Sequence, residues 1–456
     1  MKKRASWYIV VVSLLVASSS VPQAGAAVTL PKVIGSHMVL QRDRPLPIWG
    51  WADPGEEVVV KLDEATASTK ADAQGNWKVV LPAVKADGKV HHMTVSGKNK
   101  IELENILIGD VWLGSGQSNM KMGIGSCDKG KEQIAAANYP KIRLFYVLPP
   151  EKKVAPSPWA ECSPETVGTY GNWGGFSAAL YYFGQRLHKD LDVPVGLISS
   201  SKGGTSIESW TAALSKRGKP KSGKRYSGMI APLKPFAIRG TIWYQGEANV
   251  GDGLKYADKM KTLIEGWRQD WGYDFPFYFV QLPPWSGYKP GSLPPLWEAQ
   301  AASLNIPGTG MVVTTDLVDN IKNVHPKNKF DVGNRLALWA LAKDYKKDLV
   351  YSGPLYKSTN VEGNKIRLSF AHVGGGLKSR DGQPLREFEI AGVDGKFQPA
   401  KAVIDGDTVV VEAKEVASPA HVRFGWRNVP NPNLINKEGL PASPFQTDNW
   451  QGGSGE

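Results

Sequence analysis

Alternating strand and helix patterns between residues 106 and 347 constrain the fold of this chain more than any other feature. Short apolar runs predict strands, and the stretches between them repeat apolar residues at spacings of three and four, as helices do. Such βα units predict a mostly parallel sheet with helices on both faces and a ligand site beyond the carboxyl ends of the strands. The expected strands are 106–113, 143–147, 195–200, 238–244, 277–282 and 311–315, and the clearest expected helices are 176–191, 256–271 and 329–343.

Strand signals dominate on both sides of this region. Residues 27–105 combine short apolar runs with turn sequences such as Asp53-Pro54-Gly55 and have no helical period, which predicts a β-sandwich domain. Residues 348–448 return to strand signals, with a hairpin expected over 401–412, and predict a C-terminal β-rich domain. The Gly-rich residues 449–456 are expected to form a flexible tail.

Residues 1–26 have the three parts of an export signal. Lys2, Lys3 and Arg4 form a basic start, an apolar run follows, and Ala24-Gly25-Ala26 matches a small-residue cleavage site. The apolar run is too short to span a bilayer, and no later stretch is long enough to do so. We therefore expect the segment to be removed and the mature protein to be periplasmic or secreted. An uncleaved N-terminal anchor is the alternative.

Charge and cysteine content exclude several classes of protein. The formal net charge is +12, but the lysines are scattered and no arginine-rich stripe or nucleic-acid-reading motif accompanies them. The sequence therefore predicts no nucleic-acid partner, and a general attraction to acidic polysaccharides at most. The two cysteines, Cys127 and Cys162, have no CxxC partner, and no HExxH motif occurs, so we expect no metal and no cofactor. Whether the cysteines form a disulfide is left open, because their distance in space does not follow from sequence.

Ser118 directly follows the first expected strand of the α/β region. A serine at a strand-to-helix switch presents its hydroxyl at the sheet edge, beside the N–H groups that begin the helix. Met120 stands where the nucleophile elbow of α/β-hydrolases requires glycine, so that fold is not favoured. Taken alone, the segment would more often be a serine that caps a helix.

Four motifs follow one another along the chain: Gly116-Gln117-Ser118-Asn119-Met120, the decapeptide 201–210 (SKGGTSIESW), Trp243-Tyr244-Gln245-Gly246-Glu247 and His325-Pro326-Lys327-Asn328-Lys329. Together they resemble the sialate O-acetylesterase family, a branch of the SGNH/GDSL hydrolases related to carbohydrate acetylesterases. The resemblance covers nearly all of the chain after the leader, including both β-rich regions. It implies a flavodoxin-like three-layer α/β/α domain with β-rich flanks, and a serine carboxylic ester hydrolase.

The resemblance and the residues together assign an oxyanion hole. Gly203-Gly204 follows a strand, and glycine allows a backbone N–H to approach a ligand closely, although an ordinary tight turn is the alternative. Gln245 lies at the end of the next strand, and the resemblance implies that its amide donates to the oxyanion. A buried structural amide is the competing interpretation. The expected donors are therefore the N–H groups of Ser118 and Gly204 with the Gln245 side chain.

His325 is the expected base. Among seven histidines, it alone follows the last strand of the α/β region and precedes a helix, on the loop side where Ser118 should lie. It also matches the His-Pro motif of the family. Acyl transfer requires such a base within hydrogen-bond reach of the nucleophile.

The third member of a catalytic triad is not defined by the sequence. Related enzymes orient the histidine with an Asp just before it, but Lys322 and Asn323 occupy those positions here. The possible orienting acids are Asp319, Asp316 and Glu247. The alternatives are a Ser-His dyad, or a backbone carbonyl that holds the imidazole tautomer.

The expected activity is hydrolysis of acetyl esters on sugars through an acetyl-serine intermediate, so the expected partner is an acetylated sugar or polysaccharide. An acetylxylan or other polysaccharide acetylesterase is the alternative enzyme, and a non-catalytic glycan-binding protein is the alternative from another class. Aromatic residues near the motifs either stack on a sugar ring or belong to the core: Trp112, Trp210, Trp243, Tyr244, Trp285 and Trp297.

Overall fold

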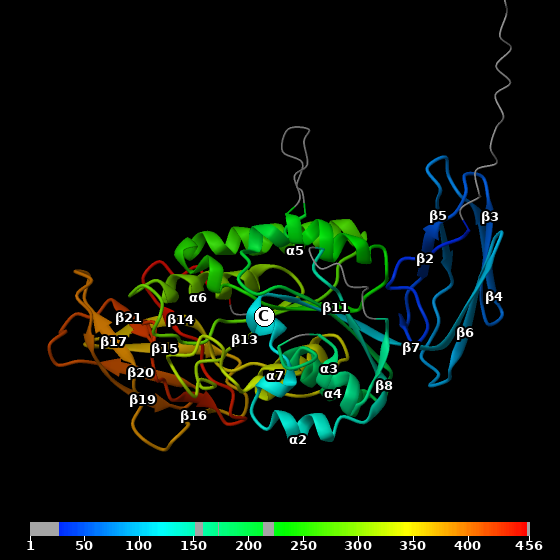
Figure 1. Cartoon of the computed structure of the whole chain (residues 1–456). Coiled ribbons are helices and arrows are strands. Elements are labelled where there is room, and N and C mark those ends of the chain that lie inside the picture. The colour runs from blue at the N-terminus through cyan, green and yellow to red at the C-terminus, as the bar shows by residue number, and fades with distance from the viewer. Residues whose placement is uncertain (1–26, 151–157, 172, 213–222, 454–456) are drawn as a thin grey trace, which may run out of the picture.

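The computed structural model describes residues 27–150, 158–171, 173–212 and 223–453. The expected export signal lies outside the described residues, as do the last three residues of the expected tail. Figure 1 shows a central α/β part between two β-rich parts, which confirms the fold class predicted from the sequence. None of the described helices is long and apolar enough to cross a membrane.

The central sheet has the strand order β13-β12-β11-β7-β10-β8-β9, parallel throughout except for the edge pair of β8 and β9. Apolar runs buried on both faces form these strands, as expected for a sheet covered by helices. Their bounds are β7 (Lys100–Gly116), β8 (Tyr139–Tyr146), β9 (Ala160–Cys162), β10 (Val195–Ser201), β11 (Gly240–Tyr244), β12 (Phe277–Val280) and β13 (Thr309–Val312). Each expected strand of the α/β region is present with shifted ends.

Helices cover both faces of this sheet (Figure 1). On one face lie α4 (Ala178–Leu191) and α7 (Lys329–Lys343), and on the other lie α5 (Tyr256–Trp271) and α6 (Leu293–Ala302). The sequence did not indicate α6, because this helix begins with two prolines and is buried on almost all sides, so it lacks a polar stripe. The shorter helices are α1 (Ser118–Lys121), α2 (Gly130–Ala135) and α3 (Pro164–Thr169).

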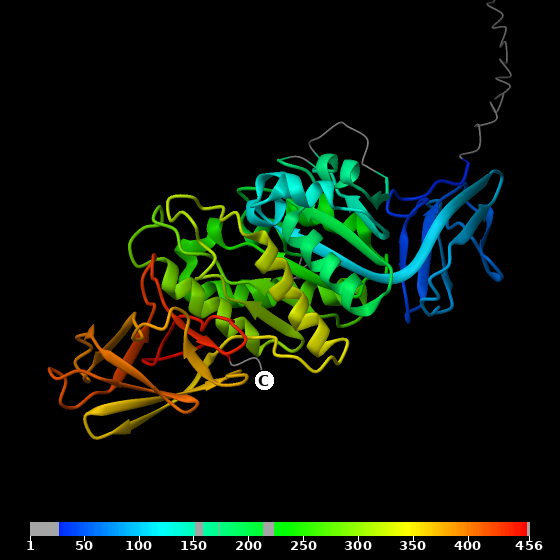
Figure 2. The same cartoon turned by 90° about the horizontal axis from the view of Figure 1, so that it is seen from below.

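The N-terminal β-rich part shares a strand with the central sheet. β7 pairs with β1 and β6 near its start and with β10 and β11 near its end, and Figure 2 shows it as one long cyan strand that joins the two parts. The expected domain boundary at 105/106 therefore lies inside a strand, and one hydrophobic core extends across both parts. The other strands here are β1 (Val39–Gln41), β2 (Leu46–Trp51), β3 (Glu57–Leu62), β4 (Ala65–Lys70), β5 (Asn76–Leu81) and β6 (His91–Ser96).

The C-terminal β-rich part has a hydrophobic core of its own. Two four-stranded antiparallel sheets, β14-β15-β20-β19 and β18-β17-β21-β23, enclose it, and the hairpin expected over 401–412 is the pair β19 and β20. Its strands are β14 (Leu355–Glu362), β15 (Lys365–Ala371), β16 (Leu377–Ser379), β17 (Phe388–Ala391), β18 (Gln398–Pro399), β19 (Lys401–Asp405), β20 (Thr408–Glu412), β21 (His421–Phe424), β22 (Leu434–Asn436) and β23 (Phe445–Gln446).

The described part of the C-terminal tail packs against α6. The Gln451 N–H donates to Glu298 Oε1 at 2.9 Å, and the Gly453 N–H donates to the Ala301 carbonyl at 2.9 Å. Trp450 contacts both hydrophobic cores. Residues 449–453 therefore link the C-terminal β-rich part to the central α/β part, although their composition alone predicts a loose end.

Cys127 and Cys162 are both free thiols in the structure. Burial raises the pKa of Cys127 to about 11 and that of Cys162 to about 12. Both groups are therefore protonated and weakly reactive at neutral pH.

Candidate active site

Ser118 lies at the carboxyl end of β7, between the ends of β10 and β11. Gly116, two residues earlier, has a φ of 135°, and a Cβ there would lie 2.2 Å from the Tyr244 carbonyl oxygen. The Gln117 N–H donates to that same carbonyl at 3.0 Å. Only glycine at 116 allows the strands to approach this closely, and the turn that follows brings Ser118 to the sheet edge.

The His325 imidazole lies against this serine. Its Nε2 is 2.9 Å from Ser118 Oγ, although the two residues are 207 positions apart in the chain. His325 is on the loop between β13 and α7, so the parallel sheet brings both side chains to the same edge. A hydroxyl in hydrogen-bond contact with an imidazole is the geometry of an activated nucleophile and its base.

Two effects lower the pKa of His325. Burial of the imidazole is the larger, and the nearby positive charge of Lys329 adds to it. A lowered pKa keeps the imidazole neutral, and therefore able to accept a proton, at neutral and mildly acidic pH. The imidazole and the Trp173 indole are nearly perpendicular, with ring centroids 4.8 Å apart.

Hydrogen bonds fix the backbone on both sides of His325. Asn119 Nδ2 donates to the Val324 carbonyl at 3.0 Å, and the buried Lys329 Nζ donates to the Pro326 carbonyl. The His325 N–H itself donates to Asn323 Oδ1 at 3.0 Å. Since Asn119 directly follows the nucleophile, this network couples the position of the base to that of the serine.

Gly203 lies beside Ser118. A Cβ added to Gly203 would be 3.4 Å from the Ser118 Cβ, and the corresponding position at Gly204 faces open space. Gly204 has a φ of 68°, in the left-handed region that favours glycine. Ser118 is the first residue of α1, so its N–H has no acceptor within the helix. Gly203 and the start of α1 therefore lie next to the Ser118 side chain, and a role of the Gly204 N–H in the oxyanion hole stays a prediction.

Gln245 is fully buried next to this space, and its amide has other partners. Gln245 Nε2 donates to Gln117 Oε1 at 3.1 Å, to the Thr205 carbonyl at 3.1 Å and to Asn249 Oδ1 at 2.8 Å. Its Oε1 accepts a hydrogen bond from the Tyr256 hydroxyl at 2.7 Å. This geometry favours a structural amide that joins the loops after β7, β10 and β11, and a role in the oxyanion hole stays a prediction.

Among the described residues, no carboxylate makes a hydrogen bond to His325. Asp316 is bound by Arg335 through both carboxylate oxygens, at 2.8 and 2.7 Å. Asp319 is exposed. Glu247 Oε1 accepts from Asn119 Nδ2 at 2.5 Å, while its buried Oε2 has no partner, and burial raises the pKa of this carboxyl. The arrangement favours a Ser-His dyad whose base is held by its loop.

Most of the aromatic residues near the motifs belong to the core, as strand-end tryptophans usually do. Trp285 is half-buried on a loop beside the His325 loop, where its Nε1 donates to the Lys322 carbonyl at 3.2 Å. Trp173, which the sequence did not indicate, is 42% exposed next to His325. The buried ones are Trp112, Trp210, Trp243, Tyr244 and Trp297. Trp173 and Trp285 are therefore the aromatic surfaces available to a sugar here.

We expect Glu247→Gln to lower kcat more than Asp319→Asn does. Glu247 binds the Asn119 amide that holds the His325 loop, and a small misplacement of a base costs about 10- to 100-fold in rate. Asp319 has no such contact, so Asp319→Asn should keep most of its kcat. Steady-state kinetics of both variants with p-nitrophenyl acetate test this ranking. The reverse ranking would give the orienting role to Asp319, and unchanged rates in both would leave the loop backbone alone to orient the imidazole.

On the acidic side of its pH profile, kcat/KM should rise as His325 loses its proton, and we call this rise the acidic limb. Lys329→Met should move the acidic limb to higher pH. Burial lowers the pKa of Lys329 to about 8, so its ammonium is mostly charged where the limb lies, and this charge lowers the pKa of His325. Without it, His325 should bind its proton at a higher pH. The matched control is Lys327→Met, because Lys327 is exposed and water screens its charge. A limb that stays in place, or moves to lower pH, would contradict this account of the His325 environment.

Comparisons with known proteins show which families and structures this chain is similar to. A family model described as carbohydrate esterase, sialic acid-specific acetylesterase, matches residues 108–342. Sialate O-acetylesterases of Pongo abelii and Homo sapiens are each 30% identical over 406 residues, which cover 76% of this chain and 77% of each relative. Among solved structures, a carbohydrate acetylesterase from Xanthomonas citri is 39% identical with a TM-score of 0.85, covering 93% of this chain and 100% of its own.

Proposed function

The chain belongs to the carbohydrate esterase family of sialic acid-specific acetylesterases, and we propose that it removes O-acetyl groups from glycans with Ser118 as nucleophile and His325 as base. The observation that carries this proposal is the 2.9 Å contact of Ser118 Oγ with His325 Nε2 at the carboxyl edge of the sheet. Gly203 and the first turn of α1 lie next to Ser118. Nucleophile, base and backbone donors are the parts that acyl transfer requires.

The reaction proceeds in two steps. His325 Nε2 accepts the hydroxyl proton as Ser118 Oγ attacks the acetyl carbonyl carbon, and the N–H groups of Ser118 and Gly204 stabilise the oxyanion. The intermediate collapses to acetyl-serine as His325 gives the proton to the leaving sugar oxygen. Water then loses a proton to His325 and attacks the acetyl-serine, acetate leaves, and the proton returns to Ser118 Oγ.

Two observations bear on the sugar. The mammalian relatives are named sialate O-acetylesterases, while the more similar solved structure is described as a carbohydrate acetylesterase. We propose a carbohydrate O-acetylesterase and keep acetylxylan or another polysaccharide as the alternative to sialate esters. Trp173 and Trp285 lie near His325, and their indoles can stack on the sugar ring of a sialate ester or of a polysaccharide such as xylan.

Acetate release from a panel of acetylated sugars tests this proposal. Wild-type protein is incubated with O-acetylated sialic acid, acetylxylan and p-nitrophenyl acetate, and Ser118→Ala is the control in each case. Acetate release from at least one glycan that depends on Ser118 is the expected result. Cleavage of p-nitrophenyl acetate without any glycan substrate would contradict the carbohydrate assignment, and binding without any hydrolysis would instead support a glycan-binding protein.

We also propose that the protein is exported. The basic start, apolar run and Ala24-Gly25-Ala26 triplet of residues 1–26 support a cleaved signal. N-terminal sequencing of protein recovered from the periplasm or medium tests this, and the mature chain should begin close to Ala27. A full-length chain retained in the cytoplasm would contradict export.

A further inference from the structure

A loop of the C-terminal β-rich part contacts the loop that lies beside the base. The first, the Asn428 loop, comprises residues 425–433 between β21 and β22. The second, the Trp285 loop, comprises residues 281–292 between β12 and α6. Since β12 is parallel to β11 and β11 to β7, the Trp285 loop begins at the same edge of the sheet as Ser118. The contact therefore connects the C-terminal part, which has a core of its own, to the edge that carries the candidate active site.

The Asn428 side-chain amide binds the Trp285 loop through both of its polar atoms. Its Nδ2 donates to the Tyr288 carbonyl at 3.2 Å and to the Lys289 carbonyl at 2.8 Å. Its Oδ1 accepts from the N–H of Leu293, the first residue of α6, at 3.2 Å. The backbone carbonyl of Asn428 also accepts from the Trp285 N–H, at 3.3 Å. Asn428 therefore fixes the middle of the loop and the start of the helix that follows it, where backbone groups have no partner within the helix.

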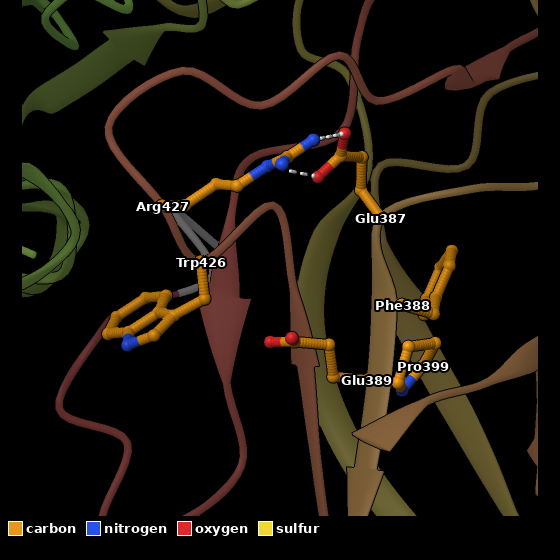
Figure 3. Close-up of a pocket in the computed structure, with 6 residues that line it drawn as sticks. All are labelled: Glu387, Phe388, Glu389, Pro399, Trp426 and Arg427. Carbon is orange, nitrogen blue, oxygen red and sulfur yellow. Dashed lines mark hydrogen bonds and ion pairs between the residues drawn. The ribbon is translucent and has the colours of Figure 1, made fainter. Parts of the chain in front are cut away.

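The Asn428 loop is itself held in place by one glutamate. Figure 3 shows the Arg427 guanidinium bound to both carboxylate oxygens of Glu387, and Nε lies 2.9 Å from Oε2. The Asn431 N–H donates to Glu387 Oε1 at 3.0 Å, and the Gly425 N–H donates to the Glu387 carbonyl at 2.9 Å. Only 11% of the Glu387 side chain is exposed. Bonds on both sides of Asn428 to this little-exposed residue keep its amide in position.

The Trp285 loop in turn supports the loop of the base, residues 313–328. Trp285 Nε1 donates to the Lys322 carbonyl at 3.2 Å. Ser286 donates to the Ile321 carbonyl twice, through its N–H at 2.9 Å and through its Oγ at 3.0 Å. These carbonyls belong to the chain just before His325. A displacement of the Trp285 loop therefore acts on the segment that carries the imidazole.

The Trp285 indole has a fixed orientation within its loop. A Cβ on Gly287 would lie 2.3 Å from the indole, so the ring lies directly against the backbone of that glycine. The Tyr288 ring packs nearly perpendicular to the indole, with centroids 4.7 Å apart. Because Asn428 binds the Tyr288 carbonyl, it also fixes the residue that packs on the indole. Loss of the Asn428 amide should therefore loosen both the loop and the ring.

We propose that Asn428 is a positioning residue for the esterase reaction. It holds the Trp285 loop, which in turn keeps His325 at the distance from Ser118 that proton transfer requires. Because this role exists only if His325 is the base, it rests on the proposed function. Asn428 acts through the Trp285 loop and takes no part in the proton transfer itself. The C-terminal β-rich part thus contributes to the rate of the reaction from outside the α/β part.

A double-mutant cycle on kcat with p-nitrophenyl acetate tests this proposal. Asn428→Ala removes three hydrogen bonds to the Trp285 loop and α6, and Trp285→Phe removes the bond to the Lys322 carbonyl but keeps an aromatic ring. Each should lower kcat by about 10-fold or more, since a small misplacement of a base costs about 10- to 100-fold in rate. Because both act on the same support, the double variant should lose clearly less than the product of the two single losses. Separate structural defects would instead multiply.

The C-terminal part should stay attached in Asn428→Ala. Gln281 Nε2 donates to Ser443 Oγ at 2.9 Å, and Gln446 Nε2 donates to Glu298 Oε2 at 3.0 Å, and neither bond involves the Asn428 loop. Asn428→Asp preserves the side-chain shape and the Oδ1 acceptor but removes the Nδ2 donor, so it should show a similar loss of kcat. This second variant keeps the test valid if Asn428→Ala does not fold.

The matched control is Asn431→Ala, an asparagine of the same loop. Its Oδ1 lies 3.4 Å from guanidinium nitrogens of Arg380 and Arg386, and within the described residues its side chain makes no hydrogen bond to the Trp285 loop. The Asn431 N–H that binds Glu387 remains in this variant. Asn431→Ala should therefore keep the wild-type kcat.

Three results would each overturn the proposal: wild-type kcat in an Asn428 variant, an equal loss in Asn431→Ala, or a loss in the double variant that equals the product of the single losses. Ser118→Ala, measured alongside, separates this proposal from the proposed function. If Ser118→Ala is inactive while Asn428→Ala keeps the wild-type rate, the esterase assignment stands and the positioning role of Asn428 fails. If Ser118→Ala remains active, the esterase assignment fails, and the positioning role fails with it.

Discussion

Ser118→Ala is expected to lower kcat by about 10⁴-fold or more while the fold stays intact, because the substitution removes only the nucleophilic oxygen. Ser118 is half-buried, and within the described residues its hydroxyl makes a side-chain hydrogen bond with His325 Nε2. Its loss therefore costs little stability. Kinetics with p-nitrophenyl acetate and with an acetylated glycan, together with thermal unfolding of the same samples, measure both effects. Retention of most activity would remove the basis of the assigned mechanism.

Ser115→Ala is the matched control for this experiment. Ser115 lies on the same strand end, three residues before Ser118, and its buried Oγ has no hydrogen-bond partner among the described residues. Its removal should leave kcat close to that of the wild type and the melting temperature unchanged or slightly raised, because an unsatisfied buried hydroxyl is unfavourable. A large loss of activity in Ser115→Ala would show that the strand end, and not the nucleophile, is sensitive to substitution.

Hydrophobic pattern alone was enough to predict the elements that position Ser118 and His325. The bounds of α5 and α7 agree with the sequence periods, because both helices have one apolar and one polar face. The parallel order of strands then brings the ends of β7, β10 and β11 together, so residues far apart in the chain meet at one edge. The fold class follows from these patterns because they are long and repeated.

The supporting contacts of the site did not follow from the sequence. Asn119 and Lys329 act through backbone carbonyls of the His325 loop, and no spacing rule indicates which carbonyl a buried side chain reaches. Trp173 belongs to a loop whose path depends on close glycine contacts, so its position beside His325 appears only in three dimensions. The sequence predicts that Gln245 lies at the end of a strand, but it does not predict the hydrogen-bond partners of its amide. These include residues on the loops after β7 and β10, so the sequence alone cannot separate a structural amide from an oxyanion donor.

The expected boundary between the N-terminal β-rich part and the central α/β part falls inside β7, for a related reason. Residues 100–105 alternate polar and apolar side chains, whereas the following residues are mostly apolar, and this change of pattern suggests a new element at 106. In the structure this change marks the point at which one strand passes from a half-exposed sheet into a sheet covered on both faces. A change of burial within one strand therefore resembles a domain boundary in sequence.

His325→Ala is expected to lower kcat/KM by about 10⁴-fold or more and to abolish the acidic limb of its pH profile. In the wild type the limb should lie below the ordinary histidine value of about 6.5, because burial and the Lys329 charge both lower the pKa of His325. His325 can act as a base only when it is unprotonated, so kcat/KM should rise as the pH increases through the pKa of His325. A lower pKa therefore extends activity to more acidic solution. Profiles of kcat/KM between pH 4 and 9 measure the limb.

His92→Ala is the control, since His92 is an exposed histidine in the N-terminal part, and its loss should leave both rate and limb unchanged. Added imidazole should restore part of the activity of His325→Ala, because the substitution leaves a space in contact with Ser118 Oγ where a free imidazole can accept the proton. The rescued rate should then follow the pKa of free imidazole and not that of the buried side chain. If the acidic limb of kcat/KM survives unchanged in His325→Ala without imidazole, another group accepts the serine proton. The contacts of Asn119 and Lys329 would then hold a loop that takes no part in the proton transfer.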